Sequence, residues 1–365
     1  MKSNTHRGRG KKIILIIVTL LLAIMFLILA GAWSMFGEKI RAARSVSRLE
    51  DGLYYMEYKG DYGFDAFLEQ GGAASDADMA VYIAEFLSNG FYHAGTVGTG
   101  QDFGCSTLCA AEPSGAQLMG RNFDWEECSA VIVHTIPDNG YESVSTCNIE
   151  FLGFGDGWKP EGLANQYMGL AAIYVPLDGM NEKGLCVADL INGDEAETHQ
   201  ERGKPALTTV SAIRLLLDKA ATVDEAVALL REYDMNSSIG TAHHFAVSDA
   251  DGNAVVIEYV DNEMTVTETF AVTNHYLSPG NKFGTGNADS HKRYDTLTSV
   301  REEAGGIMES TALRDMLEEV SDPDQTQWSI VYDKTNLMID FYWQRQYDTP
   351  HHFEIDGKGT ASIGK

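Results

Sequence analysis

The chain has 365 residues, 44% of them hydrophobic and 22% charged, which is the composition of a globular protein long enough for one large domain or two ordinary ones. Acidic residues number 53 against 27 basic ones, and the net charge of −26 argues against a nucleic-acid partner, because phosphate binding needs a basic face. No repeat with a period of 20–50 residues occurs in the sequence, which argues against a solenoid or a propeller.

The N-terminal 37 residues differ from the rest of the chain. They contain five of the 27 basic residues and none of the 53 acidic ones, so residues 38–365 carry 22 basic against 53 acidic residues, a net charge of −31. Ile13–Gly31 is a run of nineteen residues whose one polar member is Thr19. At ~1.5 Å per residue, a helix over this run is about as long as the hydrocarbon core of a bilayer is thick.

Two kinds of export segment fit this pattern. The length favours an uncleaved, single-pass anchor at 13–36 in the cell membrane, with the basic tail 1–12 in the cytoplasm and residues 38–365 outside. A cleaved signal segment, cut near the small residues Ala30-Gly31-Ala32, stays open as the alternative and would give a secreted protein.

Residue periodicity after this segment predicts a mixture of helices and hairpins. Residues 38–50 are charged and predict a short linker helix, and 75–90 predict a helix that Ser75 or Asp76 caps. From Cys105 to about Asn192, strand-like apolar segments alternate with turns. Further helices are expected at 207–220, 222–233, 289–304 and 310–320, and strands at 245–248, 254–259, 264–270, 328–332 and 337–342. Hairpins dominate this order, which favours an antiparallel α+β fold over a doubly wound sheet.

Cysteine and histidine spacing gives little support for a metal site. The five cysteines lie at positions 105, 109, 128, 147 and 186, with no second pair at zinc-finger spacing. The doublets His243-His244 and His351-His352 put neighbours on opposite sides of a strand, and residues 249–252 lack the distal Glu of a calcium loop. We therefore expect no metal and no cofactor. The odd number of cysteines indicates at least one free thiol.

Cys105 is different because of the residues around it. A hairpin closed by residues 113–116 would pair Glu112 with Gln117, which places Cys105 opposite Asp124 and Arg121 nearby on the same strand. A thiol, a guanidinium and a carboxylate would then meet at the open end of one hairpin. From the residues alone, a core cysteine beside a surface ion pair explains this pattern equally well.

Longer motifs resemble one known group of enzymes. Gly104-Cys105-Ser106-Thr107 and, sixteen residues after Gly104, Gly120-Arg121-Asn122-Phe123-Asp124-Trp125 resemble the N-terminal-nucleophile (Ntn) amidohydrolases, and more narrowly the choloylglycine hydrolase, penicillin V acylase and acid ceramidase group. The segments 179–185, 272–275, 290–294 and 328–332 are similar to later motifs of that group and follow in the same order. The resemblance covers about 105–345 and implies a four-layer αββα sandwich of antiparallel sheets.

The resemblance also implies a catalytic role for six residues. Scission of the Gly104–Cys105 bond would free the α-amine of Cys105, which could accept the proton of its own thiol because an α-amine titrates near ~8. Asp124 would orient the ammonium, and Arg121 would favour the thiolate. Asn181 and Asn274 would donate hydrogen bonds to the oxyanion and the substrate, and Arg293 would support the charge of the site. Residues 38–104 would form a leader, followed by a catalytic domain at 105–365. Such a leader is similar to the prosegment of the acyltransferase and acid-amidase branch, which remains as a separate chain.

These features together predict an exported hydrolase of a linear, non-peptide amide, acting on a small-molecule N-acyl compound through a thioester on Cys105. Three alternatives stay open: an acyltransferase on the same fold, an unprocessed binding module without turnover, and a histidine-assisted cysteine peptidase. The peptidase is the weakest of these, because the motif typical of papain-like enzymes is absent from the sequence. A homo-oligomer is compatible with the sequence.

Overall fold

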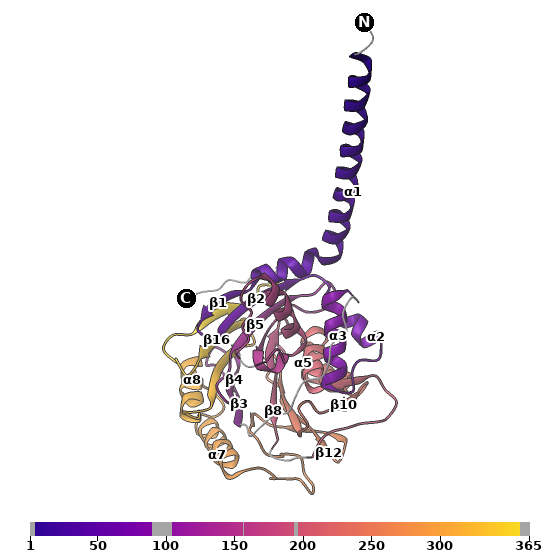
Figure 1. Ribbon diagram of the computed structural model, residues 1–365. Coiled ribbons are helices and arrows are strands. Elements are labelled where there is room, and N and C mark those ends of the chain that lie inside the picture. The colour runs from indigo at the N-terminus through magenta and orange to yellow at the C-terminus, as the bar shows by residue number, and fades with distance from the viewer. Residues whose placement is uncertain (1–3, 90–103, 156, 193–195, 358–365) are drawn as a thin grey trace.

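The computed structural model describes residues 4–89, 104–155, 157–192 and 196–357, and the side chains of residues 15 onward within these ranges. Its body is built around two β-sheets that pack face to face, with helices on the outer face of each (Figure 1). The predicted α+β class with antiparallel sheets is confirmed.

A nine-stranded sheet forms one half of the described body. Its strands, in spatial order, are β1 (Ser47–Glu50), β2 (Leu53–Lys59), β5 (Ala130–Ile136), β6 (Ser143–Asn148), β7 (Asp178–Asn181), β8 (Cys186–Ile191), β11 (His243–Ser248), β12 (Ala254–Val260) and β13 (Glu263–Glu268). Neighbouring strands run antiparallel except β2 and β5, which pair in parallel. The strands from β11 to β13 are the predicted meander.

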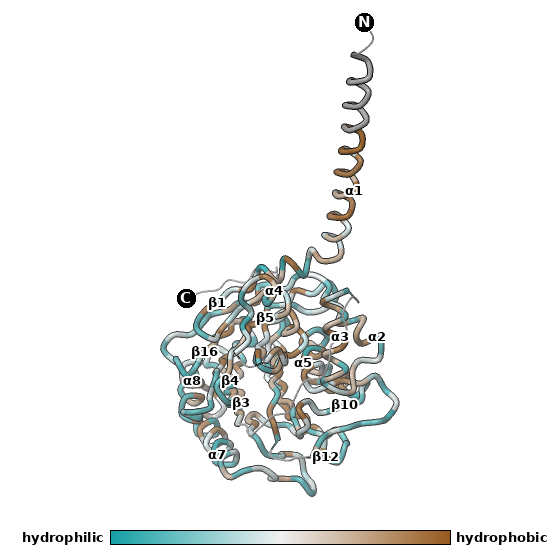
Figure 2. Tube along the Cα trace, in the orientation of Figure 1, coloured by the Kyte–Doolittle hydropathy of each residue, from teal (hydrophilic) through white to brown (hydrophobic). Residues whose placement is uncertain are grey.

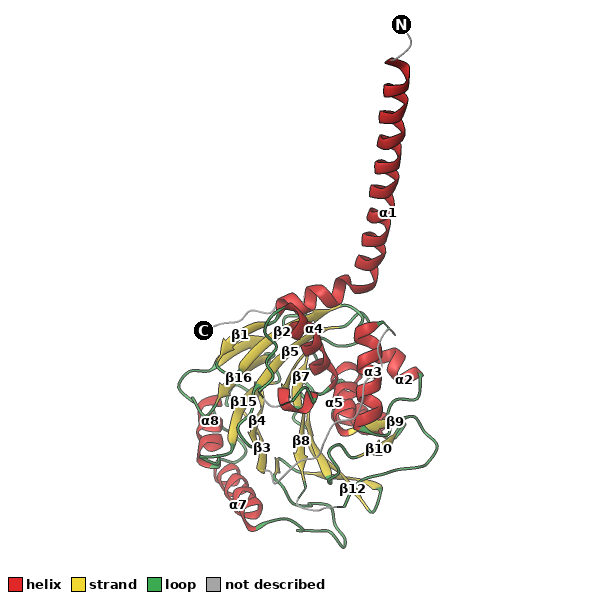
Figure 3. Ribbon diagram, in the orientation of Figure 1, coloured by secondary structure: helices red, strands yellow, loops and turns green. Residues whose placement is uncertain are grey.

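A six-stranded antiparallel sheet forms the other half. Its order is β14 (Ala271–Val272), β3 (Gly104–Ala111), β4 (Gln117–Asp124), β15 (Thr326–Asp333), β16 (Met338–Trp343) and β17 (His351–Glu354). A short parallel pair, β9 (Ala206–Thr208) and β10 (Asp234–Asn236), lies outside both sheets. Figure 3 shows the strands of the two sheets between the flanking helices.

Three apolar cores separate the layers. One lies between the sheets and includes Cys105, Leu190 and Trp328. The second joins the nine-stranded sheet to α2 (Phe64–Glu69), α3 (Asp76–Ser88), α5 (Thr209–Lys219) and α6 (Val223–Leu230), and the third joins the six-stranded sheet to α7 (Ala288–Glu303) and α8 (Ser310–Glu319). Shorter helical segments are α4 (Leu163–Met168), η1 (Ile149–Leu152) and η2 (Gly169–Tyr174).

Helix ends follow the expected side-chain caps. Ser75 accepts a hydrogen bond from the backbone N–H of Asp78 at the start of α3, and Thr222 does the same for Glu225 at the start of α6. Asn287 caps α7 in the same way. These caps satisfy backbone donors that no helical carbonyl can reach.

The first helix, α1 (Asn4–Ser45), is a long helix that leaves the body (Figure 1). Its apolar part is exposed, with Leu15 65% and Phe26 70% exposed, and Figure 2 shows a hydrophobic stretch in the part of α1 that projects from the body. It is long and apolar enough to cross a membrane, as an anchor or a signal sequence would be. The predicted separate helix at 38–50 is wrong, because α1 continues to Ser45 and the next residues pair with β2 as strand β1.

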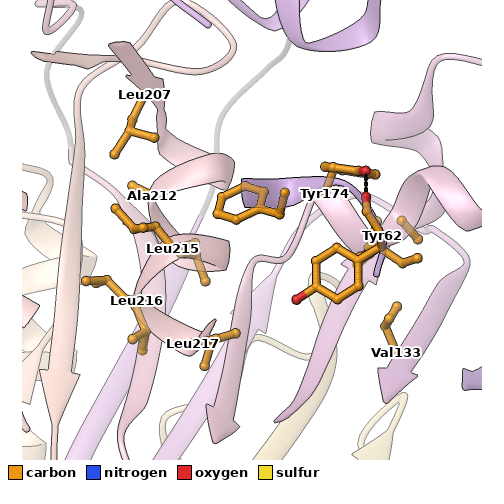
Figure 4. Close-up of a cluster of buried hydrophobic side chains, with 14 of the residues drawn as sticks. Tyr62, Val133, Tyr174, Leu207, Ala212, Leu215, Leu216 and Leu217 are labelled. Atoms are coloured by element: carbon orange, nitrogen blue, oxygen red, sulfur yellow. Dashed lines mark hydrogen bonds between the residues drawn. The ribbon is translucent and has the colours of Figure 1, made fainter. Parts of the chain in front are cut away.

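The leader, residues 38–104, shares its fold with the residues that follow it. Strand β2 pairs with β5 over seven residues, from Leu53 opposite Ala130 to Lys59 opposite Ile136. Tyr62 of the leader packs beside Val133 and Tyr174, whose hydroxyl donates a hydrogen bond to the carbonyl oxygen of Tyr62 (Figure 4). The described part of the leader and residues 105–357 therefore share one sheet and one core.

Candidate active site

The hairpin of β3 and β4 carries Cys105, Arg121 and Asp124. Its register differs by one residue from the predicted one, since Ala111 pairs with Gln117 and Cys105 lies opposite Phe123. The N–H of Glu112 donates to the carbonyl of Ala116, so the turn between them holds three residues, 113–115, and not the expected four. A shift of one residue exchanges the faces of a strand.

The corrected register separates the roles of the two charged residues. Arg121 and Phe123 share the face of Cys105 between the sheets, whereas Asp124 lies opposite Gly104 on the other face. The thiol of Cys105 therefore meets the guanidinium, and the carboxylate lies beside the peptide that precedes the thiol.

The Cys105 thiol is buried and lies near one positive and one negative side chain. Cys105 is 3% exposed, and burial raises the pKa of its thiol. The positive charge of Arg121 lowers this pKa, and the negative charge of Asp124 raises it further. Burial alone would lower the pKa of Arg121, but the neighbouring Cys105 and Asp178 outweigh it and raise this pKa. Arg121 thus remains charged and favours the thiolate over the thiol.

Arg121 is held in place by the opposite sheet. Its Nη2 donates to the carbonyl oxygen of Asp189 at 2.8 Å, and its Nε lies 3.4 Å from Oδ2 of Asp178, a fully buried ion pair. The carboxylate of Asp178 also accepts hydrogen bonds from Trp328 Nε1 at 3.0 Å and from the Tyr332 hydroxyl at 3.2 Å. These bonds offset the desolvation of both charges and leave the guanidinium a single orientation.

Asp124 lies beside the backbone of Gly104. A Cβ atom on Gly104 would come within 2.9 Å of Asp124 Oδ2 and 3.5 Å of Arg293 Nη2, so a larger residue there would displace the carboxylate. Oδ1 of Asp124 accepts a hydrogen bond of 2.6 Å from the Thr326 hydroxyl. Burial raises the pKa of Asp124 to about 6, against the opposing effect of Arg293. This carboxyl is therefore ionised at neutral pH and can accept a proton in mild acid.

Asn274 and Arg293 hold the backbone of Cys105 from the other side. Oδ1 of Asn274 accepts the Cys105 N–H at 2.7 Å, and its Nδ2 donates to the Ile191 carbonyl at 2.6 Å. Arg293 on α7 donates to the carbonyl oxygen of Cys105, to Ser106 Oγ at 2.6 Å and to Asn274 Oδ1 at 2.9 Å. The sequence-predicted residues Cys105, Arg121, Asp124, Asn274 and Arg293 thus form one group, which we call the Cys105 site.

Asn181 is not part of the Cys105 site. It faces the helical layer, where its Nδ2 donates to the carbonyls of Leu217 and Ala220 at 3.0 and 2.8 Å. Its Oδ1 accepts the N–H groups of Lys183 and Leu185. These four bonds tie the β7–β8 turn to the end of α5 and use the whole amide, so the expected oxyanion donor is here a structural residue.

Two residues absent from the sequence-based set have unusual environments. Asp178 pairs with Arg121, and strand alternation could have identified it, because Asp178 and Asn181 of one short strand must face opposite sides. Asn192 is 1% exposed, and neither polar atom of its side chain has a hydrogen-bond partner among the residues that the structure describes. A lone Asn after a strand gives no such indication in the sequence.

Alternation along β8 places Asn192 on the inner face of its sheet. Cys186, Ala188 and Leu190 all belong to the core between the sheets, as Cys105 does. The N–H of Asn192 donates to the carbonyl of Ala242 at 2.9 Å, which continues the strand ladder by one residue. Its amide therefore follows Leu190 on the face that lies toward the six-stranded sheet.

The chemistry available here is that of a thiol nucleophile. Within the part of the chain that the structure describes, no group of three or more His, Cys, Asp or Glu side chains could hold a metal ion, and all five cysteines are free thiols. The Cys105 site offers a thiol, a cation beside it and a carboxylate next to the preceding peptide. This arrangement suits acyl transfer through a thioester.

Comparisons with known proteins agree with this chemistry. The model of the family "linear amide C-N hydrolases, choloylglycine hydrolase family" matches residues 105–301. Penicillin V acylase of Pectobacterium atrosepticum is 24% identical over 187 residues, which are 47% of this chain and 48% of that protein. The alignment therefore spans about half of that curated relative.

One of the solved structures that resemble this chain shows the same fold. A variant of conjugated bile acid hydrolase from Clostridium perfringens superposes with a TM-score of 0.52 at 15% identity, covering 72% of this chain and 96% of that one. Penicillin V acylase from Agrobacterium tumefaciens has a TM-score of 0.43 at 17% identity, covering 71% and 90%. The first match identifies the fold as the one found in bile acid hydrolase.

Proposed function

Because the chain belongs to the choloylglycine hydrolase family of linear amide C-N hydrolases, we propose that it hydrolyses a small N-acyl amide through Cys105, after cleavage of its own Gly104–Cys105 bond. The observation that carries this proposal is the arrangement around that one peptide. Asp124 lies against Gly104, Asn274 and Arg293 hold the two sides of Cys105, and Arg121 lies beside the thiol. The family match also begins at Cys105.

Cleavage converts the Cys105 N–H into an α-amine at the same position. Asn274 Oδ1 already accepts a hydrogen bond from this nitrogen, and Asp124 lies beside the bond that would break. The two would then orient the amine toward the thiol of the same residue. An α-amine titrates near ~8 and can take the thiol proton at neutral pH, so the reaction needs no histidine base.

The hydrolytic cycle follows from these positions. The Cys105 sulfur attacks the substrate carbonyl while the α-amine takes the thiol proton, and the ammonium then protonates the departing amine. The thioester that remains is attacked by water, which gives its proton to the α-amine and releases the carboxylic acid. Arg121 stabilises the thiolate before attack and after release.

The oxyanion donor requires a revision of the sequence-based assignment. The Asn181 amide donates its hydrogen bonds to carbonyls at the end of α5. The Asn274 amide is hydrogen-bonded to the Cys105 nitrogen and the Ile191 carbonyl. The Asn192 amide, directly after β8, is buried on the inner face of that sheet and has no hydrogen-bond partner within the described part of the chain. We therefore assign Nδ2 of Asn192 to the oxyanion that forms on the substrate carbonyl.

A panel of amides tests this function. Phenoxymethylpenicillin and a glycine-conjugated bile acid represent the substrates for which the two similar proteins are named, and N-acyl amino acids and N-acyl amines extend the panel. We expect release of the acid from at least one of them, and no release by Cys105→Ala. Unchanged hydrolysis by folded Cys105→Ala would refute the nucleophile. Transfer of the acyl group to an added amine, at the expense of the free acid, would favour the acyltransferase alternative.

A further inference from the structure

A strained turn lies close to the Cys105 site. Ile239 has a φ of +48°, and Gly240 follows at +69°. A β-branched residue rarely adopts this left-handed conformation, because its side chain crowds the backbone. Such a conformation persists only where neighbouring groups hold it.

The group that holds this turn comes from the leader. Asp76 is the first residue of α3, and its carboxylate accepts hydrogen bonds of 2.8 Å from the Ser238 hydroxyl and 2.8 Å from the Ile239 N–H. Both oxygens are therefore used, one on each residue of the turn. Asp76 lies upstream of the proposed cleavage point, whereas the turn lies far downstream of it.

The turn connects to the Cys105 site through His243. The ring Nε2 donates to the Ser238 carbonyl at 2.9 Å, and Nδ1 lies 2.9 Å from the Asp189 carboxylate. The carbonyl of Asp189 in turn accepts from Arg121, the residue beside the thiol.

A second connection leaves the end of the same loop. The carbonyl of Ala242 accepts the N–H of Asn192, so the loop that begins at Ser238 also sets the position of the proposed oxyanion donor. A change at the turn thus reaches both Arg121 and Asn192.

We propose that Asp76 is a positioning residue for the Cys105 site, so that the leader completes the active site after it has been cut from the catalytic chain. The inference rests on the proposed function for its catalytic consequence. Its structural content is independent: without the Asp76 carboxylate, Ile239 should leave the left-handed region and the loop up to Ala242 should shift.

The chain offers both a control and a rescue for this proposal. Asp78 lies in the same first turn of α3, and within the described residues its carboxylate accepts a hydrogen bond from Ser75 alone, so Asp78→Ala removes a helix-start carboxylate without touching the turn at 238–240. Ile239→Gly makes the left-handed conformation unstrained. The double variant Asp76→Ala/Ile239→Gly should then keep the conformation of the turn without the two hydrogen bonds from Asp76.

The experiment compares wild type with Asp76→Ala, Asp78→Ala and the double variant, each purified as the full processed protein. We expect Asp76→Ala to lower kcat/KM at least tenfold, Asp78→Ala to lower it less than threefold, and Ile239→Gly to restore most of the loss in the double variant. Thermal midpoints show whether Asp76→Ala and Asp78→Ala lose similar stability. Equal activities for the two alanine variants, or no rescue by Ile239→Gly, would overturn the proposal.

Alkylation of Cys105 by iodoacetamide separates this claim from the proposed function. The rate is followed on the Cys105 peptide by mass spectrometry and needs no substrate. We expect Asp76→Ala to slow it at neutral pH, because a displaced Arg121 favours the thiolate less, and Ile239→Gly to reverse the change. An inactive wild type with this alkylation pattern would refute the function and keep the positioning role. An active wild type with unchanged alkylation in every variant would refute the positioning role alone.

Discussion

Two buried carboxylates near Cys105, Asp124 and Asp178, have different hydrogen-bond surroundings. Burial raises the pKa of both Asp124 and Asp178. Asp178 has the Arg121 guanidinium and two hydroxyl or indole donors around it, and these fix it as the counter-ion of Arg121. Asp124 has one donor, Thr326, and its other oxygen lies beside Gly104. Asp124 is therefore the carboxylate that can exchange a proton with the peptide to be cut.

The pKa of Asp124 makes self-cleavage dependent on pH. A carboxyl whose pKa is about 6 in the uncut chain becomes protonated as the pH falls through that value, and it then loses its ability to accept a proton or to hold an ammonium. We expect the rate of cleavage before Cys105 to fall with acidification through about pH 6. Freshly translated chain shifted into buffers between about pH 5 and about pH 8 gives this profile on a gel. Cleavage of Asp124→Asn should be slow and flat over this range, and a wild-type rate with no such dependence would contradict the role.

The two buried asparagines should respond differently to alanine. Asn192→Ala should lower kcat by roughly 10²–10³, the usual effect of losing an oxyanion donor. The free energy of unfolding should change little, because no described residue forms a hydrogen bond with this amide. Asn181→Ala leaves four backbone groups unpaired and should cost on the order of 2–4 kcal/mol of stability. Kinetics and urea unfolding of both variants decide this. A kcat loss in Asn181→Ala alone, with its stability intact, would reverse the two assignments.

At the scale of elements, local sequence signals predict the helices well but do not determine how the strands pair or in which register. The capping residues Ser75 and Thr222 predict the first residues of α3 and α6 within one or two positions. The start of a helix can be predicted because it depends on neighbours in the sequence. The predicted β3–β4 register differs from the observed one by one residue, because a turn of three residues in place of four changes all pairings. The charged sequence predicts a helix over 38–50, but residues 47–50 form strand β1 because pairing with β2 decides their conformation.

The same limit applies to the Cys105 site. Motif order identified Cys105, Arg121, Asp124, Asn274 and Arg293, and the structure brings these five together. It could not identify Asn192, since burial without a partner is a property of the fold and leaves no trace in local sequence. Asn181 was misassigned because the face of a short strand depends on register.

At the scale of the whole molecule, the leader is a structural part of the body. Its side chains Leu53, Tyr54, Tyr55, Met56, Tyr58, Tyr62, Phe64 and Phe67 are buried. All eight belong to the apolar cores that the leader shares with residues after Cys105, so separating the two parts would expose them to water. Cleavage before Cys105 should therefore leave two chains in one particle.

The exposed helix α1, together with the stable association of the leader with the catalytic chain, predicts where the catalytic chain is found in the cell. If α1 is an anchor, the leader should hold the cleaved catalytic chain on the membrane even though no peptide bond connects them. Membranes washed with salt should retain both chains, and ~6 M urea should release the catalytic chain alone. Release of the catalytic chain by a salt wash would contradict a stable association between the leader and the catalytic chain. Recovery of both chains together in the soluble exported fraction would instead identify α1 as a cleaved signal.

The central claim is that Cys105 becomes the N-terminal residue and nucleophile of this enzyme, and its most direct test is the intact mass of the purified chains. For wild type we predict two chains, the second beginning at Cys105, with an iodoacetamide-reactive thiol on that residue. For Cys105→Ala we predict one uncut chain, because the sulfur that attacks the Gly104 carbonyl is missing. A fully active wild type that remains uncut, or a Cys105→Ala chain cut at the same bond, would contradict the account.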